Sequence, residues 1–343
     1  MKRLSYVWVV VIFAVLLSVS LIACGGGGGS GSSSNSSNSN TSDGELLGWW
    51  EAQWSEDGAS INAKYTKGNN SLSEITTTKN TYNQYGILVR IDEVTTAKGV
   101  DTYGREQDLT TDSLYLWLGG KVRPDSSLRT GTFVYPAGMQ FDQSQYSRSI
   151  NSTITYQYDS MGNLTGGSYS ENFSGQISFQ TGKFTYSGNV TATPEIKDGQ
   201  LLFKQQVETT DYYDGGKLYA ETERIISGNS QYFGGKWVTV SENHVTKTTY
   251  ANGSQRNSDI NILWQRDQYG INTGKSGSGV VTGSEIINGK PVNYTGSITV
   301  DYDFHSNLGW YKSGYYESRV AESSLPKRLP FEVILFIDDI CFN

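Results

Sequence analysis

The chain has few of the residues that most often bind metals or nucleic acid. It contains 2 histidines and 2 cysteines among 343 residues, and 27 Lys and Arg against 34 Asp and Glu give a net charge of −7. Two cysteines are too few for a cysteine-based metal site. An acidic chain without basic clusters argues against nucleic acid and against docking on anionic lipid. We therefore expect no metal, no cofactor and no nucleic-acid partner.

Recognisable catalytic motifs are missing as well. His244 and His305 have neither ligand nor triad spacing, and we expect no catalytic role for either. We interpret several other groups as ordinary turn or strand-face residues, because they lack a nucleophile elbow, a phosphate loop or a calcium loop. They are Ser152, Ser168, Gly274-Lys275-Ser276, Asp301 with Asp303, and Asp338 with Asp339. The sequence thus predicts a protein that is not an enzyme. Carboxylates that hydrolyse glycosides meet in space rather than in sequence, so an envelope-associated enzyme acting on polysaccharide is the alternative.

Residues 1–23 have the order of an export signal. Lys2 and Arg3 precede a long apolar stretch and then small residues. The stretch closes with Leu21-Ile22-Ala23-Cys24, which resembles the lipobox of bacterial lipoproteins. The resemblance implies removal of residues 1–23 and lipidation of Cys24, whose acyl chains would hold the protein on a membrane. An uncleaved signal anchor is the alternative.

The lipobox resemblance also predicts a location. Gly25 follows Cys24, with no Asp at the position that retains enterobacterial lipoproteins in the inner membrane. The resemblance therefore implies lipid anchoring at the outer membrane or the cell surface. A lipidated Cys24 leaves Cys341 as the only thiol, which excludes an internal disulfide. Residues 24–44 are expected to be a lipidated cysteine and a disordered Gly/Ser/Asn-rich tether, since they cannot bury apolar area.

Residues 45–343 alternate apolar and polar residues with a period of two. From Tyr294 to Phe304 the even positions are aromatic, aliphatic or Gly, and the odd positions are Thr, Ser or Asp. Residues 173–180 and 153–158 alternate in the same way. Such alternation predicts strands with one wet face. The continuous apolar run from Leu114 to Leu118 instead predicts burial on both faces.

Turn residues separate these strands at short intervals. Asn252-Gly253 and Asn288-Gly289 favour two-residue hairpin turns. Further candidates are Asp57-Gly58, Asp198-Gly199, Asp214-Gly215 and Met161-Gly162-Asn163. No long segment has a helical period, and only residues 320–328 could hold a short helix. The predicted fold is all-β: an antiparallel meander of many strands that closes as a β-barrel, with a β-sandwich or two smaller β units dividing near residues 195–200 as alternatives.

A transmembrane barrel is a further way to use amphipathic strands. It needs a consistent apolar face on every segment of about 10 residues. The polar stretch 143–149 interrupts that pattern, and a lipid anchor would be redundant for an integral barrel. We therefore favour a β domain carried on a tether.

Three short segments resemble known strand patterns. Gly48 and Trp50 stand in the Gly-x-Trp positions that open lipocalin-type barrels. Residues 172–179 parallel residues 293–300, with Asn, Gly and Ile in common, and resemble strands of transferrin-binding-type surface lipoproteins. Residues 158–165 are similar to one unit of a YD-repeat, which we interpret as a single hairpin. These likenesses imply lipoprotein β-barrels at the level of single strands only.

The aromatic residues supply the remaining lead to function. The chain has 23 Tyr, and Trp49, Trp50 and Trp54 cluster just after the tether. Most aromatics are expected to pack the core, but this tryptophan cluster is the candidate binding site, because rings stack on sugars or line pockets. The predicted function is a lipid-anchored envelope or cell-surface β domain with a non-enzymatic binding or structural role. Beyond the membrane, its partner is a glycan, an apolar ligand or a protein.

Overall fold

A computed structural model describes residues 49–55, 60–67, 70–100, 105–135, 145–179, 182–305 and 309–321. Cys24, the tether, the Asp57-Gly58 turn, residues 322–328, Asp338, Asp339 and Cys341 lie outside these ranges. Every regular element within the ranges is a β-strand. The prediction of an all-β fold is therefore confirmed.

The strands are long, and most have 13 to 17 residues. The first eight are β1 (Trp49–Trp54), β2 (Ser60–Lys67), β3 (Asn70–Tyr82), β4 (Leu88–Val100), β5 (Glu106–Leu118), β6 (Lys121–Tyr135), β7 (Gln145–Tyr158) and β8 (Leu164–Phe179). The second eight are β9 (Gly182–Lys197), β10 (Gln200–Asp214), β11 (Lys217–Phe233), β12 (Lys236–Tyr250), β13 (Gln255–Arg266), β14 (Asn272–Ile287), β15 (Lys290–His305) and β16 (Gly309–Ala321).

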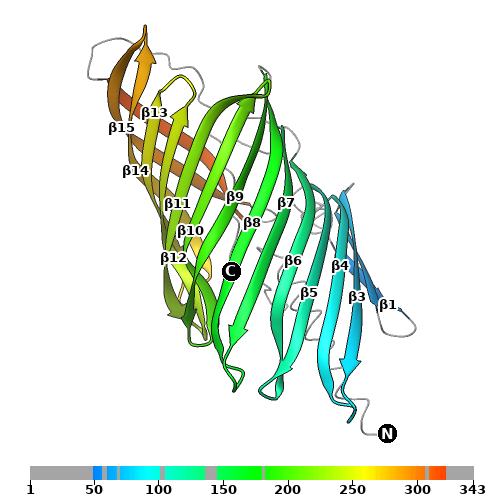
Figure 1. Cartoon of the computed structure of the whole chain (residues 1–343). Helices are drawn as coiled ribbons and strands as arrows, with labels where there is room; N and C mark the ends of the chain where they lie inside the picture. Colours follow the sequence, from blue (N-terminus) through cyan, green and yellow to red (C-terminus); the bar gives the residue numbers. More distant parts are fainter. Residues whose placement is uncertain are drawn as a thin grey trace, which may run out of the picture.

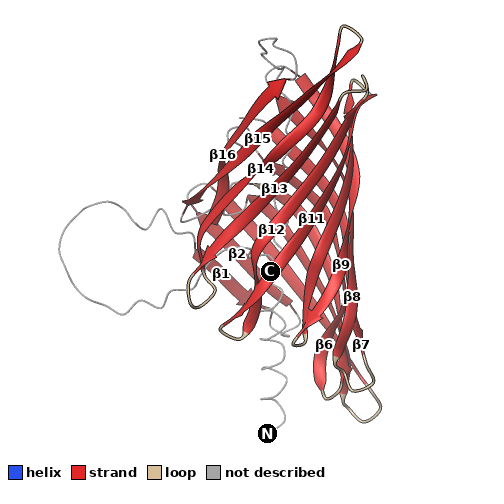
Figure 2. Cartoon of the chain, turned by 90° about the vertical axis from the view of Figure 1, so that its left-hand side faces the viewer, coloured by secondary structure: helices blue, strands red, loops and turns tan. Residues whose placement is uncertain are grey.

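All sixteen strands form one antiparallel sheet in chain order, so the predicted meander is confirmed. The sheet is strongly rolled (Figures 1 and 2). Within the described ranges β1 and β16 are not paired with each other, so the predicted closure into a barrel is wrong for this part of the chain. Each of these two strands is paired on one side only in the described part, β1 with β2 and β16 with β15.

The sheet is continuous where the sequence suggested a division. β9 and β10 pair from Gln200↔Lys197 onward, across a tight turn at Asp198 and Gly199. A single sheet also replaces the β-sandwich alternative.

The rolled sheet has two distinct faces. We call the face that carries the buried side chains the inner face and the opposite one the outer face. Phe173 and Ile177 in β8, and Tyr294 and Ile298 in β15, are 5% exposed or less, while the neighbours Ser174, Thr295 and Ser297 face outward. The predicted alternation is confirmed in both strands. The apolar run in β5 is buried on one face only, since Tyr115 is 6% exposed while Leu114 and Leu116 on the opposite face are half-buried, and the prediction of two buried faces is wrong.

Strand glycines lie on the inner face opposite large side chains. A Cβ at Gly175 would lie 2.5 Å from Tyr186 Cζ, and one at Gly277 would lie 3.0 Å from Val300 Cβ. Gly99 and Gly131 have φ values of 132° and 141°, which L-residues rarely adopt. Gly175 and Gly277 thus make room for an aromatic and a branched neighbour on the inside of the roll, whereas at Gly99 and Gly131 a Cβ would meet a backbone carbonyl oxygen.

Three hairpins share one loop geometry. The side chains of Asn83, Asp159 and Asp267 each accept hydrogen bonds from the backbone N–H groups two and four residues later. A glycine at the fourth position has positive φ in all three loops. Elsewhere Asn288-Gly289 and Asp198-Gly199 form two-residue turns with positive φ at both residues, whereas Gly215-Gly216 takes the place predicted for Asp214-Gly215. The two-residue turn predicted at Asn252-Gly253 is wrong, because four residues separate β12 from β13 there.

Candidate functional site

The predicted binding cluster lies on the first strand. Pairing of β1 with β2 sets Trp50 opposite Tyr65 and Trp54 opposite Ile61, so the backbone alternation puts these two tryptophans on one face and Trp49 on the other. Their side chains lie outside the described part of the structure. The tryptophan site therefore stays a prediction.

A row of polar residues crosses the inner face instead, one residue per strand from β3 to β16. Successive pairings place them directly opposite one another. We call this set the inner polar row: Thr76, Thr95, Thr111, Arg129, Ser152, Glu171, Glu208, Arg224, Thr246, Ser258 and Arg319, with Val190, Val281 and Gly296 interrupting it. Most of its members are buried.

Arg148 and Glu171 form the ion pair at the centre of the sheet. Their side chains are 7% and 4% exposed and joined by a hydrogen bond. Tyr169 donates a second hydrogen bond to Glu171 at 2.8 Å, and the guanidinium lies 3.9 Å from the Phe173 ring centroid. Both charges are thus neutralised and enclosed by aromatic rings.

Glu208 and Arg224 repeat this arrangement on β10 and β11. They face each other in the ladder, and Arg224 Nη2 lies 2.7 Å from Glu208 Oε2. Thr210 donates a further hydrogen bond to Glu208 at 3.2 Å. Direct cross-strand pairing holds this pair in place without a loop.

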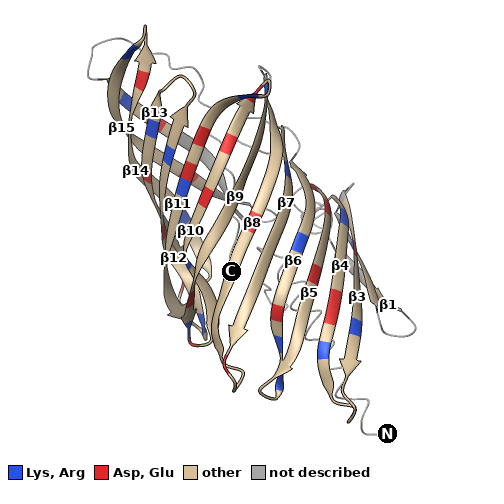
Figure 3. Ribbon diagram, viewed as in Figure 1, with Lys and Arg blue, Asp and Glu red and all other residues tan. Residues whose placement is uncertain are grey.

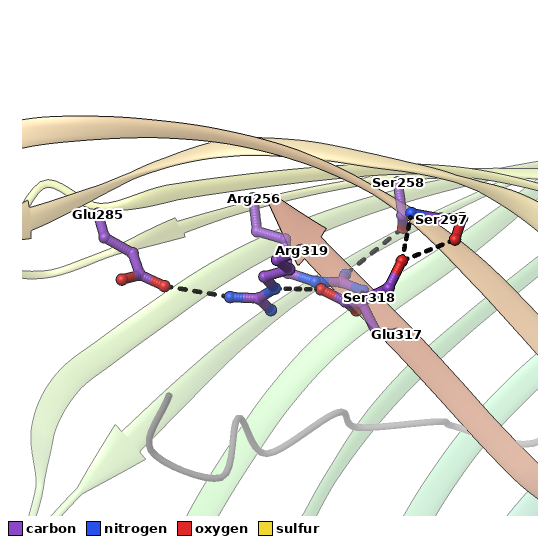
Figure 4. Close-up of polar contacts among 7 residues, drawn as sticks. All are labelled: Arg256, Ser258, Glu285, Ser297, Glu317, Ser318 and Arg319. Atoms are coloured by element: carbon purple, nitrogen blue, oxygen red, sulfur yellow. Dashed lines mark hydrogen bonds and ion pairs between the residues drawn. The ribbon is translucent and has the colours of Figure 1, made fainter. Parts of the chain in front are cut away.

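A four-residue ion network ties β16 to β13 and β14 (Figure 4). Arg256 Nη2 donates to Glu317 Oε2 at 2.7 Å, and Arg319 donates to the other Glu317 oxygen. Arg319 Nη1 also reaches Glu285 Oε1 at 3.2 Å. Two cations thus balance two anions, and Arg256 and Glu317 have side chains that are each 8% exposed.

Glu74 and Glu93 are buried carboxylates whose pKa values are raised above the ordinary value. They lie on the inner face of β3 and β4 and are 3% and 2% exposed. Burial raises the pKa of Glu93 to about 7; the hydroxyl of Tyr115 lowers it, and the charge of Glu74 adds to the rise. Burial also raises the pKa of Glu74, opposed by Arg129. Glu93 Oε2 has no hydrogen-bond partner in the described structure.

The other residues singled out in the sequence have structural surroundings. His244 is buried on the inner face and contacts Glu242 at 2.9 Å. Gly274-Lys275-Ser276 is part of β14 rather than a flexible turn, and Lys275 Nζ lies 4.0 Å from the Trp264 ring centroid. Asp301 is an exposed residue of β15, and the side chain of His305 lies outside the described part.

The sequence contained one signal for the inner ion pairs. Arg148 shares the apolar phase of its strand with Ile150, and Glu171 shares that of Phe173. A charge in the apolar phase indicates a buried partner, because an unpaired charge is costly to bury. Which residue is the partner depends on strand register, which the sequence did not supply.

No family model, no curated protein and no solved structure matches this chain. In the described ranges, no three His, Cys, Asp or Glu side chains gather in a way that could hold a metal ion. The same ranges contain no helix of the length and apolarity needed to cross a membrane.

Proposed function

We propose that the protein is a lipid-anchored envelope or cell-surface β domain with a non-enzymatic binding or structural role. The observation that carries this proposal is how the charged side chains of the inner face are buried and paired. Apart from Glu74 and Glu93, the buried charged groups of this face are matched by opposite charges or aromatic rings, as for Arg148, Glu171 and Lys275. Side chains that are buried in contacts between strands are poorly placed to react with a substrate.

The outer face supports the same proposal. Its centre, over β7, β8 and β9, is an in-register grid of three rows: Ser149, Ser174 and Ser187; Asn151, Asn172 and Asn189; and Thr153, Ser170 and Thr191. β7 and β8 carry one charged residue each, Arg148 and Glu171, and both point inward; Figure 3 shows long uncoloured stretches on these strands. Hydroxyl and amide groups suit contact with water, whereas lipid-facing strands need apolar side chains.

An enzyme acting on polysaccharide is less well supported. A glycosidase needs two carboxylates that flank a sugar chain. Glu74 and Glu93 have the raised pKa values that a general acid needs, but exposures of 3% and 2% leave no room for a sugar beside them.

The anchor is tested with the full chain and a Cys24→Ala variant. We expect wild-type protein to incorporate labelled palmitate and to fractionate with membranes, and the variant to do neither. Processing that resists globomycin, or equal membrane attachment of both proteins, would contradict the proposal.

The binding role is tested with purified full-length protein in detergent. Glycan and lipid arrays report binding, and hydrolysis of soluble polysaccharides reports catalysis. Turnover that is lost on Glu93→Gln replacement would favour the enzyme instead.

A further inference from the structure

The rolled sheet exposes large apolar residues at one end. In a meander every connection from an odd to an even strand lies at the same end, which is the lower end in Figures 1 and 2. Eight of the seventeen large apolar side chains that are exposed in the described part lie in these connections or within two residues of them. We call the eight the apolar rim: Tyr82, Tyr85, Ile87, Trp117, Met161, Tyr232, Tyr269 and Ile271.

The shared loop geometry holds three rim residues outward. Tyr85, Met161 and Tyr269 each stand two positions after the Asn or Asp that closes the loop, and they are 78%, 71% and 65% exposed. The same side chain–backbone hydrogen bonds fix all three loops. These side chains therefore point outward because the hydrogen bonds of the hairpins fix the loop conformation, and not because the loops lack such bonds.

Neighbouring hairpins bring rim residues together in two groups. Gly119, in the turn after Trp117, packs so closely on the β7–β8 loop that a Cβ there would lie 2.2 Å from the Met161 carbonyl oxygen. At the other group, the rings of Tyr232 and Trp237 are 5.7 Å apart, and Gly270, beside Tyr269, packs on Phe233. Clustered apolar exposure of this kind marks an interaction surface, whereas single exposed residues do not.

The chemistry of the rim fits a bilayer interface. Tyr and Trp favour the headgroup level, where the ring is buried and the polar tip stays wet. Charges of both signs flank the rim, including Lys121, Lys236, Asp159 and Asp267, so attraction to anionic lipid would contribute little. We propose that the apolar rim inserts into the interface of the bilayer that carries the proposed Cys24 anchor.

The chain is long enough to let both contacts form on one bilayer. β1 begins at the end opposite the rim, because odd strands run toward the rim. Strands of 13 to 17 residues are roughly 45–55 Å long at about 3.3 Å per residue. The 25 steps from Cys24 to Trp49 reach roughly 80–90 Å when extended, at about 3.3–3.6 Å each. The choice of bilayer rests on the proposed function, whereas the insertion itself does not.

Trp117 is the probe for this proposal. Full-length protein is reconstituted in phosphatidylcholine vesicles with and without bromine-labelled acyl chains, and subtracting the emission of a Trp117→Phe variant isolates the rim tryptophan. We expect at least a twofold loss of Trp117 emission in the brominated vesicles. The loss should disappear in a Tyr85→Ser, Met161→Ser, Tyr269→Ser variant.

A matched variant changes exposed apolar residues away from the rim: Leu128→Ser, Val245→Ser and Val280→Ser. It should be quenched as strongly as the wild type, and urea midpoints of all variants check that they fold. Unquenched Trp117, or quenching that survives in the rim variant, would overturn the proposal and favour a protein partner for this end.

The Cys24→Ala chain separates this proposal from the anchor. If the wild type takes up no palmitate label and both chains show rim-dependent quenching, the anchor fails and the rim proposal stands. If the wild type is labelled but Trp117 is never quenched, the anchor stands and the rim proposal fails.

Discussion

The ring of Phe173 on β8 lies over Gly188, its direct partner on β9. A Cβ at Gly188 would be 2.6 Å from Phe173 Cζ and 2.1 Å from the Thr209 carbonyl oxygen. Tyr294 on β15 covers Gly283 on β14 in the same way, where a Cβ would be 2.5 Å from the Tyr294 hydroxyl oxygen. An aromatic ring opposite a glycine is thus a recurring unit of the inner face.

Gly188→Ala should destabilise the protein, because the added methyl has no space in front of the ring or the neighbouring carbonyl. We expect a loss of about 1–3 kcal/mol in the free energy of unfolding, as in other overpacked cores. Gly228→Ala is the matched control, since the only neighbour of a Cβ there is Thr239 Cγ2 at 3.9 Å. Urea titration measures both, and equal midpoints would refute the packing argument.

Stability should depend on pH through Glu93. Its pKa is raised from 4.5 to about 7 in the folded state, so the native protein holds a proton that the unfolded chain releases. The stabilisation is present in full below pH 4.5 and is lost as pH rises through 7. A shift of this size corresponds to about 3 kcal/mol.

Glu93→Gln should remove this dependence and raise stability at pH 8, which urea titration at pH 5 and pH 8 would show. Glu106→Gln, an exposed change on the adjacent β5, is the control and should keep the wild-type slope. If the stability of the Glu93→Gln variant changed with pH as steeply as that of the wild type, groups other than Glu93 would dominate the pH dependence.

Removing Glu317 should be far more damaging than removing a surface carboxylate. Glu317→Ala leaves Arg256 and Arg319 without the carboxylate that they share, and breaking a buried pair costs about 3–5 kcal/mol. Asp108→Asn breaks the Lys98–Asp108 pair, whose side chains are 78% and 60% exposed, and should leave the unfolding midpoint unchanged. If Glu317→Ala changes the unfolding midpoint as little as Asp108→Asn does, the network in Figure 4 adds no stability.

The three equivalent loops should accept Asn and Asp interchangeably. Asp267→Ala removes the acceptor of two backbone hydrogen bonds and should lower stability by about 1 kcal/mol. Asp267→Asn should be neutral, because Asn83 performs the same task in its own loop. Thermal melting distinguishes the two variants, and a destabilised Asn variant would mean that the negative charge is needed.

The candidate site shows the limit of sequence reasoning through particular residues. Alternation correctly identified Phe173 and Tyr294 as inward, because side-chain direction depends only on position along one strand. The same local information failed for Leu114 and Leu116, since burial on the second face depends on what other elements cover it. Tyr85 and Tyr269 belong to separate loops in the sequence, and only the sheet topology shows that both stand at one end.

The sequence by itself determined the all-β character, the alternating faces of several strands, and turns such as Asn288-Gly289 and Asp198-Gly199, since these act through contacts between near neighbours. Tertiary structure decided the order of sixteen strands in one open, rolled sheet, and with it every cross-strand partner. Arg256 and Glu317 are 61 residues apart, and they meet because stacked hairpins carry register across β13 to β16. The register between two distant strands depends on every turn and bulge that lies between them, so no local sequence pattern predicts it.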